Sequence, residues 1–573
     1  MSDSSVFNTA GPGAEPRSGG RGVPLSPAQQ AALLPERLRG TPAANLSAAL
    51  EITGDIDVTE LGRAAVATLS RHEILRTVYP ADRRIPYQRV ADAPESVLEV
   101  VDLAPGDDLA AALRADAAHR FDLTADLPVR LRLYRSATGA VLSIAVHPIA
   151  ADDRTVDVLI AELLGADTAA ADSVRQYRAH ALAQVKTLAG NAADDGELGY
   201  WLECLAGLPE RAAVVVSSSG AGAGSDSAAG QDVPASARRT LRLPADVVAA
   251  LTGAADLEAA TTAVLATVLA EAGLGADVAV GIVDAGRADD AVAFGAYANY
   301  LVLRVDTASA RTPRALVTAV SDLAVAARSH AGTRIERLTH QLRGAVAVAD
   351  GVPFQALVNV RTEPTAGLSV RELERRVARP HGADIVVDIV TGDGDATVTV
   401  DFPAKMAGRP EIDAITQAFE QRFAQWAAAP DDSLPIGAGE VPTLFERFDA
   451  AYAGMTGLGG EPETDAERLL AEGIREVLDL DSDDPVGRSD TFFSLGGDSI
   501  AALRLVTLLG ERGYTLDVQH VFEFPAVREM ASRLVAAEPG QEQAAEPAAV
   551  APMSASGLDP AALRAVAGKF AAR

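Results

Sequence analysis

The chain has 573 residues, 48% of them hydrophobic and 23% charged, which predicts a folded protein with three or four domain-sized parts. Its 79 acidic and 50 basic residues give a formal net charge of −29, which argues against a nucleic-acid binder and against docking on an anionic membrane. The single cysteine, Cys204, permits neither an internal disulfide nor a cysteine-cluster metal site. We expect no metal and an inert, core-filling thiol.

The N-terminus lacks the pattern of a signal peptide. Residues 1–22 are rich in Gly, Ser and Pro, with no basic start followed by an apolar stretch, and they predict a disordered leader. No uninterrupted apolar run of about 18 residues occurs in the chain. We therefore expect a cytoplasmic protein that does not enter a membrane.

Alternating strand and helix patterns predict two α/β lobes, residues 23–212 and 237–435. The first lobe has strand patterns at 46–56 and within 129–146, and helical spacing at 58–70 and 199–208. The second has strand patterns at 237–243, 278–283, 300–306, 354–360, 384–390 and 396–402, and helices near 244–272, 312–331 and 410–428. The intervening residues 213–236, rich in Gly, Ser and Ala, predict a flexible loop.

The pattern changes after the second lobe. Residues 436–462 predict a linker with one short helix at 443–453, and residues 463–537 predict a small all-α domain of four helices. Residues 461–540 hold 17 acidic and 7 basic side chains, a net charge of −10. The remaining residues, 538–573, predict a linker and a last helix that either docks on a partner or frays.

The most distinctive local pattern is DTFFSLGGDSIAALRL at residues 490–505. Gly496 and Gly497 permit a tight turn, and Asp498 can cap the amphipathic helix that begins at Ser499. A phosphodiester on Ser499 would lie near the positive end of the helix dipole, which stabilises an anion. An ordinary glycine turn with an Asp/Ser cap is the alternative, but the paired phenylalanines and the acidic surroundings favour a modified serine.

This stretch resembles the peptidyl carrier proteins of nonribosomal peptide synthetases, whose signature is FFxLGGxS. The resemblance covers about residues 463–537 and implies that a phosphopantetheinyl transferase attaches 4'-phosphopantetheine to Ser499, beside Asp498. The terminal thiol would hold an aminoacyl or peptidyl group as a thioester. The acidic surface fits such carriers, which engage partners with basic patches.

A second constellation is SIAVHPIAADDRTVDVL, at residues 143–159. The pattern predicts a strand that ends at His147, with Asp152 and Asp153 in the loop or helix start that follows. A histidine beside a carboxylate can act as a general base. A strand-end histidine and an N-cap aspartate without a catalytic role are the alternative.

Several further stretches resemble, in order, the condensation domains of the same synthetases. They are RHEILRTVYP (71–80), FDLTADLPVRLRLYR (121–135), YWLECLAGLP (200–209), GIVDAGR (281–287), FGAYANYLVLRVD (294–306) and PFQALVNV (353–360). The resemblance covers about residues 23–435 and implies two chloramphenicol-acetyltransferase-like lobes that face one another. It also implies that Arg287 forms an ion pair with Asp152.

The family's HHxxxDG motif is altered here. Pro148 replaces the second histidine, which in the family helps the acceptor amine attack the donor thioester, and a proline side chain can neither take up a proton nor form a hydrogen bond. His147 and Asp152 remain as candidate catalytic residues. Asp153 replaces the glycine, and we expect its carboxylate to narrow or charge the site. The family's HQDxPFE motif is reduced to HAGTRIE at 330–336.

Two functions fit these features. In the first, the degenerate domain is a platform in natural-product (antibiotic) biosynthesis that presents the Ser499 thioester to other synthetase modules or tailoring enzymes. Related degenerate domains of glycopeptide assembly lines recruit tailoring oxygenases in this way. In the second, it is an active condensation enzyme that joins an upstream donor to the aminoacyl group on its own carrier. Because residues 436–462 cannot hold an adenylation domain, we expect an adenylation enzyme to load the carrier in trans.

Overall fold

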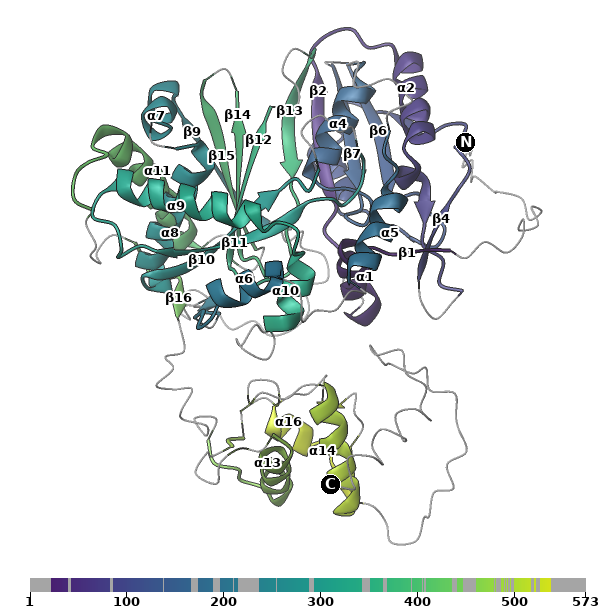
Figure 1. The fold of residues 1–573 in the computed structure, drawn as a ribbon. Coiled ribbons are helices and arrows are strands. Elements are labelled where there is room, and N and C mark those ends of the chain that lie inside the picture. The colour runs from purple at the N-terminus through teal and green to yellow at the C-terminus, as the bar shows by residue number, and fades with distance from the viewer. Residues whose placement is uncertain are drawn as a thin grey trace. The chain divides into compact units, whose positions relative to one another are not determined.

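The computed structural model divides into two compact units, residues 1–453 and 454–573 (Figure 1). It describes residues 22–39, 43–82, 86–137, 139–165, 174–188, 196–209, 211–214, 236–253, 255–287, 293–342, 351–363, 368–392, 394–403, 406, 409–434, 441–446, 460–478, 480, 486–488, 490, 492, 495, 499–516, 520–521 and 526–536. Apart from Gly22, the predicted leader lies outside the described residues, and so do the predicted helix in the C-terminal tail and most of the two predicted linkers.

The first lobe is built on a five-stranded sheet with the order β13-β2-β7-β6-β5. Its strands are β2 (Leu46–Ile52), β5 (Leu98–Asp102), β6 (Val129–Ser136), β7 (Gly139–Val146) and β13 (Val370–Arg376). Only β5 and β6 run parallel, and the other neighbours are antiparallel. A smaller sheet joins β1 (Val23–Pro24), β4 (Tyr87–Val90) and β3 (Thr77–Val78). The helices are α1 (Pro27–Arg39), α2 (Val58–Arg71), η1 (Glu73–Arg76), α3 (Leu109–Ala117), α4 (Asp153–Leu163) and α5 (Tyr177–Leu188).

The second lobe has a six-stranded mixed sheet with the order β11-β10-β12-β14-β15-β9. Its strands are β9 (Ser236–Leu243), β10 (Asp277–Asp284), β11 (Asn299–Asp306), β12 (Ala356–Thr362), β14 (Ile385–Thr391) and β15 (Ala396–Pro403). The helices are α6 (Gly196–Cys204), α7 (Ala245–Leu251), α8 (Leu257–Leu269), η5 (Ala270–Leu274), α9 (Pro313–Ser329), α10 (Ile335–Leu342) and α11 (Pro410–Ala428). Helix α8 packs against both α9 and α11, and all three helices contact the sheet (Figure 1).

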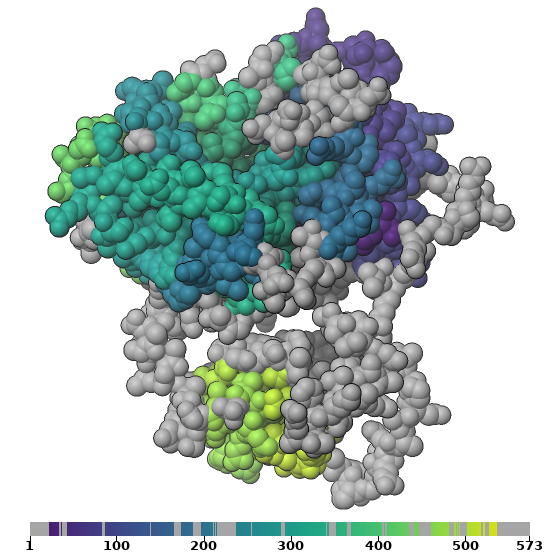
Figure 2. Space-filling model, in the orientation of Figure 1, coloured from purple at the N-terminus to yellow at the C-terminus, as the bar shows by residue number. Residues whose placement is uncertain are grey.

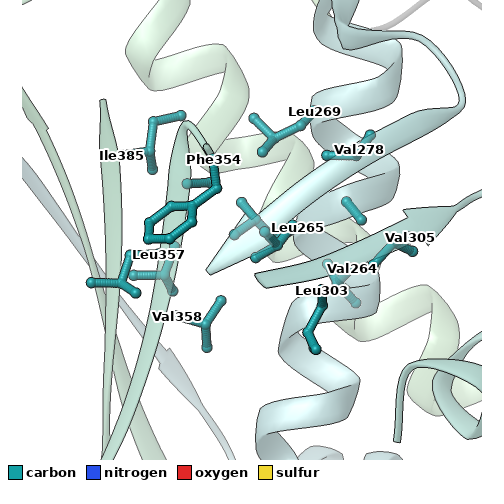
Figure 3. Packing of buried hydrophobic residues seen from close by; sticks show 14 of the residues in the cluster. Val264, Leu265, Leu269, Val278, Leu303, Val305, Phe354, Leu357, Val358 and Ile385 are labelled. Carbon is teal, nitrogen blue, oxygen red and sulfur yellow. The ribbon is translucent and has the colours of Figure 1, made fainter. Parts of the chain in front are cut away.

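The core of the second lobe forms around α8, which is buried on every side. Figure 3 shows Val264, Leu265 and Leu269 of this helix facing apolar side chains of the sheet and Phe354, which lies just before β12. The ring of Phe354 lies over Gly281 of β10, where an added Cβ would come within 2.5 Å of it. A continuous apolar helix of this kind is expected when it lies between a sheet and other helices. The stretch Leu257–Leu274 is apolar enough to span a membrane by composition, but 83% of it is buried inside the fold.

The two lobes exchange segments. Strand β13 lies among residues predicted for the second lobe, yet it pairs with β2 of the first lobe, as its green ribbon beside the purple β2 shows (Figure 1). Ala293, Phe294 and Tyr297 likewise enter the first core. Conversely, α6 lies among residues predicted for the first lobe, yet it places Leu198 and Trp201 in the second core. In Figure 2 the blue surface of α6 lies against teal residues of the second lobe. These crossings hold the lobes in one compact unit.

The predicted α/β architecture is confirmed, and each predicted strand range of both lobes contains a strand. Two local expectations differ from the structure. Cys204 is exposed on α6 rather than buried, because the helix turns Trp201 inward instead. Within the predicted helix 443–453, Phe445 and Glu446 form β16, which pairs with β8 (Ala213–Val214). The remaining part of that prediction, from residue 447, lies outside the described residues.

The second unit is a small helical domain. It contains α13 (Asp465–Leu478), α14 (Ser499–Glu511) and α16 (Val527–Ala531), together with the two-residue pair β17 (Tyr514–Thr515) and β18 (Val535–Ala536). Helix α13 begins with reciprocal hydrogen bonds, in which Thr464 accepts from the Glu467 amide and Glu467 accepts from the Thr464 amide. The core contains Leu470, Ile474, Phe492, Leu505, Leu509 and Met530.

Candidate functional site

His147 lies directly after β7 and is 1% exposed. Its Nδ1 accepts a hydrogen bond from the Ile149 amide at 3.1 Å, so the proton of the neutral ring is on Nε2. Nε2 lies 3.3 Å from a carboxylate oxygen of Glu36 on α1. Burial raises the pKa of Glu36, but the hydrogen bonds from His147 and the Ala43 amide together lower this pKa by more. The net shift of the Glu36 pKa is therefore downward. Both ring nitrogens of His147 are therefore occupied.

Asp152 is the N-cap of α4, and its carboxylate accepts five hydrogen bonds. One oxygen accepts from the amide and hydroxyl of Thr155, at 2.9 and 2.8 Å. The other accepts from Arg287 at 2.7 Å and from the amides of Tyr297 and Ala298 at 3.0 and 2.9 Å. The structure thus brings Arg287 and Asp152 together as a buried ion pair, with side chains 5% and 6% exposed.

The segment that reaches Asp152 depends on Gly295. This residue has φ of +146°, and an added Cβ would lie 2.1 Å from the Tyr177 ring. Its carbonyl accepts a hydrogen bond from Arg287 and lies 2.9 Å from the Thr155 hydroxyl oxygen, and its amide donates to that oxygen at 3.1 Å. The guanidinium of Arg287 also lies 4.6 Å from the centre of the Tyr297 ring. Asp152 of the altered motif and the segment around Gly295 therefore belong to one buried hydrogen-bond network.

The expectation that the Asp153 carboxylate narrows the site differs from the structure. Asp153 is the first residue of α4 and is 8% exposed, and its carboxylate accepts from the Ala378 amide at 3.1 and 3.3 Å. Because β13 crosses into the first lobe just before Ala378, this amide lies within reach of the helix start. Asp153 thus contacts the crossing segment.

His180 on α5 is a residue that the motif comparison missed. Its ring lies 4.4 Å from that of Tyr297, and its Nε2 is buried with no hydrogen-bond partner among the described residues. Burial and the charges of Arg334 and Arg287 lower the pKa of His180 to about 4. It is therefore neutral at physiological pH. No sequence signal marked His180 or Glu36, because each meets the motif only through the tertiary fold.

The HAGTRIE segment has a supporting role in the structure. Arg334 pairs with Glu336 at 3.0 Å and donates to the Tyr297 carbonyl at 2.9 Å. Asn299 donates to the carbonyls of Ala331 and Thr333. These contacts fix the segment against the start of β11, although His330 Nδ1 and Thr333 Oγ1 are buried with no hydrogen-bond partner among the described residues.

In the second unit, the structure places Ser499 at the first position of the 13-residue helix α14. Asp498 and the two preceding glycines lie outside the described residues. Within the described part of the chain, no group of three or more His, Cys, Asp or Glu side chains could hold a metal ion. An attachment residue at a helix N-terminus suits a phosphodiester, because the free amides and the helix dipole favour an anion.

Comparison with known proteins identifies both units. The family model of the condensation domain matches residues 21–434. The chain belongs to the condensation-domain family. The phosphopantetheine attachment site matches residues 468–534, so a carrier domain with covalently attached 4'-phosphopantetheine follows the condensation domain. The resemblance found in the sequence is confirmed.

The curated relatives of this condensation and carrier pair are peptide synthetases. A probable non-canonical nonribosomal peptide synthetase, CymA of Salinispora arenicola, is 31% identical over 77% of this chain and 6% of its own length. The isonitrile lipopeptide synthase of Mycobacterium tuberculosis is 29% identical over 72% of this chain and 18% of its own length. The chain thus spans a small part of these relatives.

Solved structures agree with the two-lobed condensation fold. The first condensation domain of the CDA synthetase has a TM-score of 0.59 and 20% identity, covering 73% of this chain and 99% of its own. The X-domain from teicoplanin biosynthesis, solved in complex with OxyB, has a TM-score of 0.57 and 25% identity, covering 74% of this chain and 97% of its own.

Proposed function

We propose that this chain carries an aminoacyl or peptidyl thioester on the phosphopantetheine of Ser499, and that its condensation domain is a platform that presents this group to partner enzymes. In this function the domain does not extend the group by histidine-assisted amide formation. The partners are a phosphopantetheinyl transferase, an adenylation enzyme that loads the carrier, and synthetase modules or tailoring enzymes that act on the loaded group.

One observation carries this proposal: His147 and Asp152, the polar residues that remain in the altered motif, are hydrogen-bonded to other groups of the protein. A general base needs a free lone pair within hydrogen-bond reach of the proton it abstracts. The Nδ1 lone pair of His147 accepts from Ile149, and both oxygens of Asp152 accept from the protein. Pro148 offers no acceptor on its side chain.

The likeness to the teicoplanin X-domain supports a platform. In that complex a domain of this fold binds a partner protein, OxyB. The net charge of −10 over residues 461–540 would favour a partner with a basic docking face, because complementary charge steers association.

Active condensation remains the second candidate, and one observation favours it. His180 holds an unpartnered Nε2 close to Tyr297 and the Asp152–Arg287 pair. Its low pKa makes it a weak base, but holding two tethered substrates close together accelerates a reaction without any base. Amide formation by this domain would then depend on His180 and substrate positioning.

Intact-mass measurement on the full chain separates the two functions. A transferase and a synthetic aminoacyl-coenzyme A load Ser499 without the adenylation enzyme, and a donor carrier with its own acyl thioester is then added. A platform leaves the Ser499-bound group unextended, whereas a condensation enzyme adds the donor acyl group. A condensation domain with an intact HHxxxDG motif, assayed alongside, shows that the donor is competent. Extension in the wild type that His180→Ala abolishes would establish the second candidate.

A further inference from the structure

A buried cluster of charged side chains lies where β13 crosses from one lobe to the other. Its members come from four elements: Asp153 and Asp157 of α4, Glu372 and Arg375 of β13, Arg361 of β12, and Asp388 of β14. Helix α4 belongs to the first lobe, and β12 and β14 belong to the sheet of the second. The cluster therefore connects the lobes through the crossing strand.

On the side of the first lobe, α4 is tied to the crossing segment by three groups. The Asp153 carboxylate accepts from the Ala378 amide, two residues after β13. Arg375 donates to the main-chain carbonyl of Asp153 at 3.1 Å and to the carboxylate of Asp157 at 2.6 Å. The Arg375 side chain is only 3% exposed. A glycine at position 153 would lack the carboxylate that holds Ala378.

On the side of the second lobe, Arg361 makes the connection. It donates to Glu372 of β13 at 2.7 Å and lies 3.1 Å from Asp388 of β14. Asn359 donates to the same aspartate at 3.0 Å. A continuous series of charged contacts thus runs from α4 through β13 to the second sheet.

The cluster contains four carboxylates and only two guanidinium groups. With every group ionised it would hold two uncompensated negative charges away from water, and buried charges without partners are strongly unfavourable. Two nitrogens of Arg375, Nε and Nη1, have no hydrogen-bond partner among the described residues, and its hydrogen bonds to α4 come from Nη2. The titratable and charged groups around Asp153 are Asp157 on its own helix, Arg375 and Glu372 on β13, Arg361 on β12, Asp388 on β14, Tyr300 on β11 and the adjacent Asp152.

We propose that Asp153 is a proton-sensitive tie between the two lobes, which is tight when its carboxyl is neutral and loosens when the carboxyl is charged. The neutral form still accepts the Ala378 amide hydrogen bond and removes one of the two excess charges. The charged form faces repulsion from Asp157 and Asp388. The tie holds whichever of the two candidate functions the domain has.

The electrostatics agree with this geometry. Burial raises the pKa of Asp153 to about 7, with Asp388 and Asp157 acting in the same direction and Arg375 and the Ala378 amide opposing. Burial also raises the pKa of Asp388. Because the folded pKa of Asp153 lies above its ordinary value of 3.8, the folded junction binds the proton more tightly than the unfolded chain does. The junction is therefore weakened as the pH rises toward and through 7.

Distances between spin labels in the full chain test the tie. Labels on Val100→Cys of β5 and Val325→Cys of α9 report the separation of the lobes, because both positions are exposed. The exposed Cys204 is first replaced by serine so that only these two sites react. The wild-type distance distribution should be narrow at about pH 6 and become broader or longer at about pH 8, on either side of the Asp153 titration.

Two variants at one position sharpen the test. Asp153→Asn keeps an oxygen for the Ala378 amide but carries no charge, so its distribution should stay narrow at both pH values. Asp153→Gly removes the tie and should be broad at both. A wild-type distribution that is the same at both pH values would overturn the proposal, and so would an Asn variant that broadens as the wild type does.

Hydrogen exchange provides a second measurement if the glycine variant does not fold. In the wild type, exchange over residues 370–378 should accelerate between about pH 6 and pH 8 by more than in Asp153→Asn, which shares the intrinsic pH dependence of exchange. Equal acceleration in the two proteins would show that Asp153 does not control the junction.

Discussion

Nε2 of His147 lies 3.3 Å from Glu36, although 111 positions separate the two residues in the chain. Helix α1 thus supplies the partner of the histidine that persists from the altered motif. The pair is partly closed from water, since the His147 side chain is 2% exposed and that of Glu36 is 23% exposed. Because both ring nitrogens of His147 have partners in the protein, this histidine has a structural role and is not a free base.

Removing Glu36 should destabilise the first unit. Glu36→Ala leaves the buried imidazole N–H without its acceptor, which costs about 1–3 kcal/mol in the free energy of unfolding. Glu60→Ala is the matched control, because it breaks an exposed ion pair with Arg63 that is worth about 0–1 kcal/mol. Urea unfolding of both variants measures the difference, and equal costs would contradict the assignment.

The Glu36 contribution should also depend on pH. Because the folded pKa of Glu36 lies below its ordinary value of 4.5, its stabilisation is present above that value and is lost as the pH falls through the folded pKa. The stability difference between wild type and Glu36→Ala should therefore shrink below pH 4.5. A difference that grows on acidification would have the wrong sign for this pair.

The buried pair of Asp152 and Arg287 should be strongly coupled. Breaking such a pair by removing one partner costs about 3–5 kcal/mol, because the other charge stays buried and unpaired. We expect Arg287→Ala and Asp152→Asn each to lower stability severely, and the double variant to lose much less than their sum. A double-mutant cycle measured by chemical unfolding tests this, and strictly additive losses would contradict it.

Two glycine substitutions should act in opposite directions. Gly295→Ala places a methyl group against the buried Tyr177 ring, at a positive φ, and should cost at least about 1–3 kcal/mol. Gly62→Ala, inside α2 with nothing within 4 Å of the added Cβ, should stabilise by up to about 1 kcal/mol through helix propensity. Thermal unfolding distinguishes them. A Gly295→Ala protein as stable as wild type would mean that the segment at Asp152 is not held as described.

Ser499→Ala should abolish attachment of phosphopantetheine while leaving the helix α14 intact, since alanine is a strong helix former. Ser494→Ala, five positions earlier in the same motif, is the control and should be modified as the wild type is. Intact mass after incubation with a transferase and coenzyme A reads out both. Modification of the Ser499→Ala protein would place the attachment site elsewhere.

Local patterns in the sequence predicted most of the regular elements, because alternating or helical apolar spacing marks them directly. Strand β13 was not predicted, because its sequence, VRELERR, is dominated by charged residues. Its buried Arg375 pairs with Asp157 of α4, and its half-buried Glu372 pairs with Arg361 of β12. A strand stabilised in this way carries no apolar signal.

The site was predicted only in part for the same reason. Motif resemblance pointed to His147, Asp152 and Arg287, and the structure brings Asp152 and Arg287 into contact. The partner of His147 and the role of Asp153 depend on long-range packing of α1 and of the segment after β13. Resemblance to the condensation-domain motif identifies the altered positions. The contacts that an altered side chain makes, such as that of Asp153 with Ala378, are seen only in the folded structure.

The most direct test of the platform function is the mass of the group bound to Ser499 after the loaded protein meets a loaded donor carrier. The wild type and Pro148→His should both keep the original aminoacyl mass, because one restored imidazole does not replace the other altered positions of the site. Appearance of the donor-extended mass in the wild type, at a rate comparable to that of an intact condensation domain, would contradict the account.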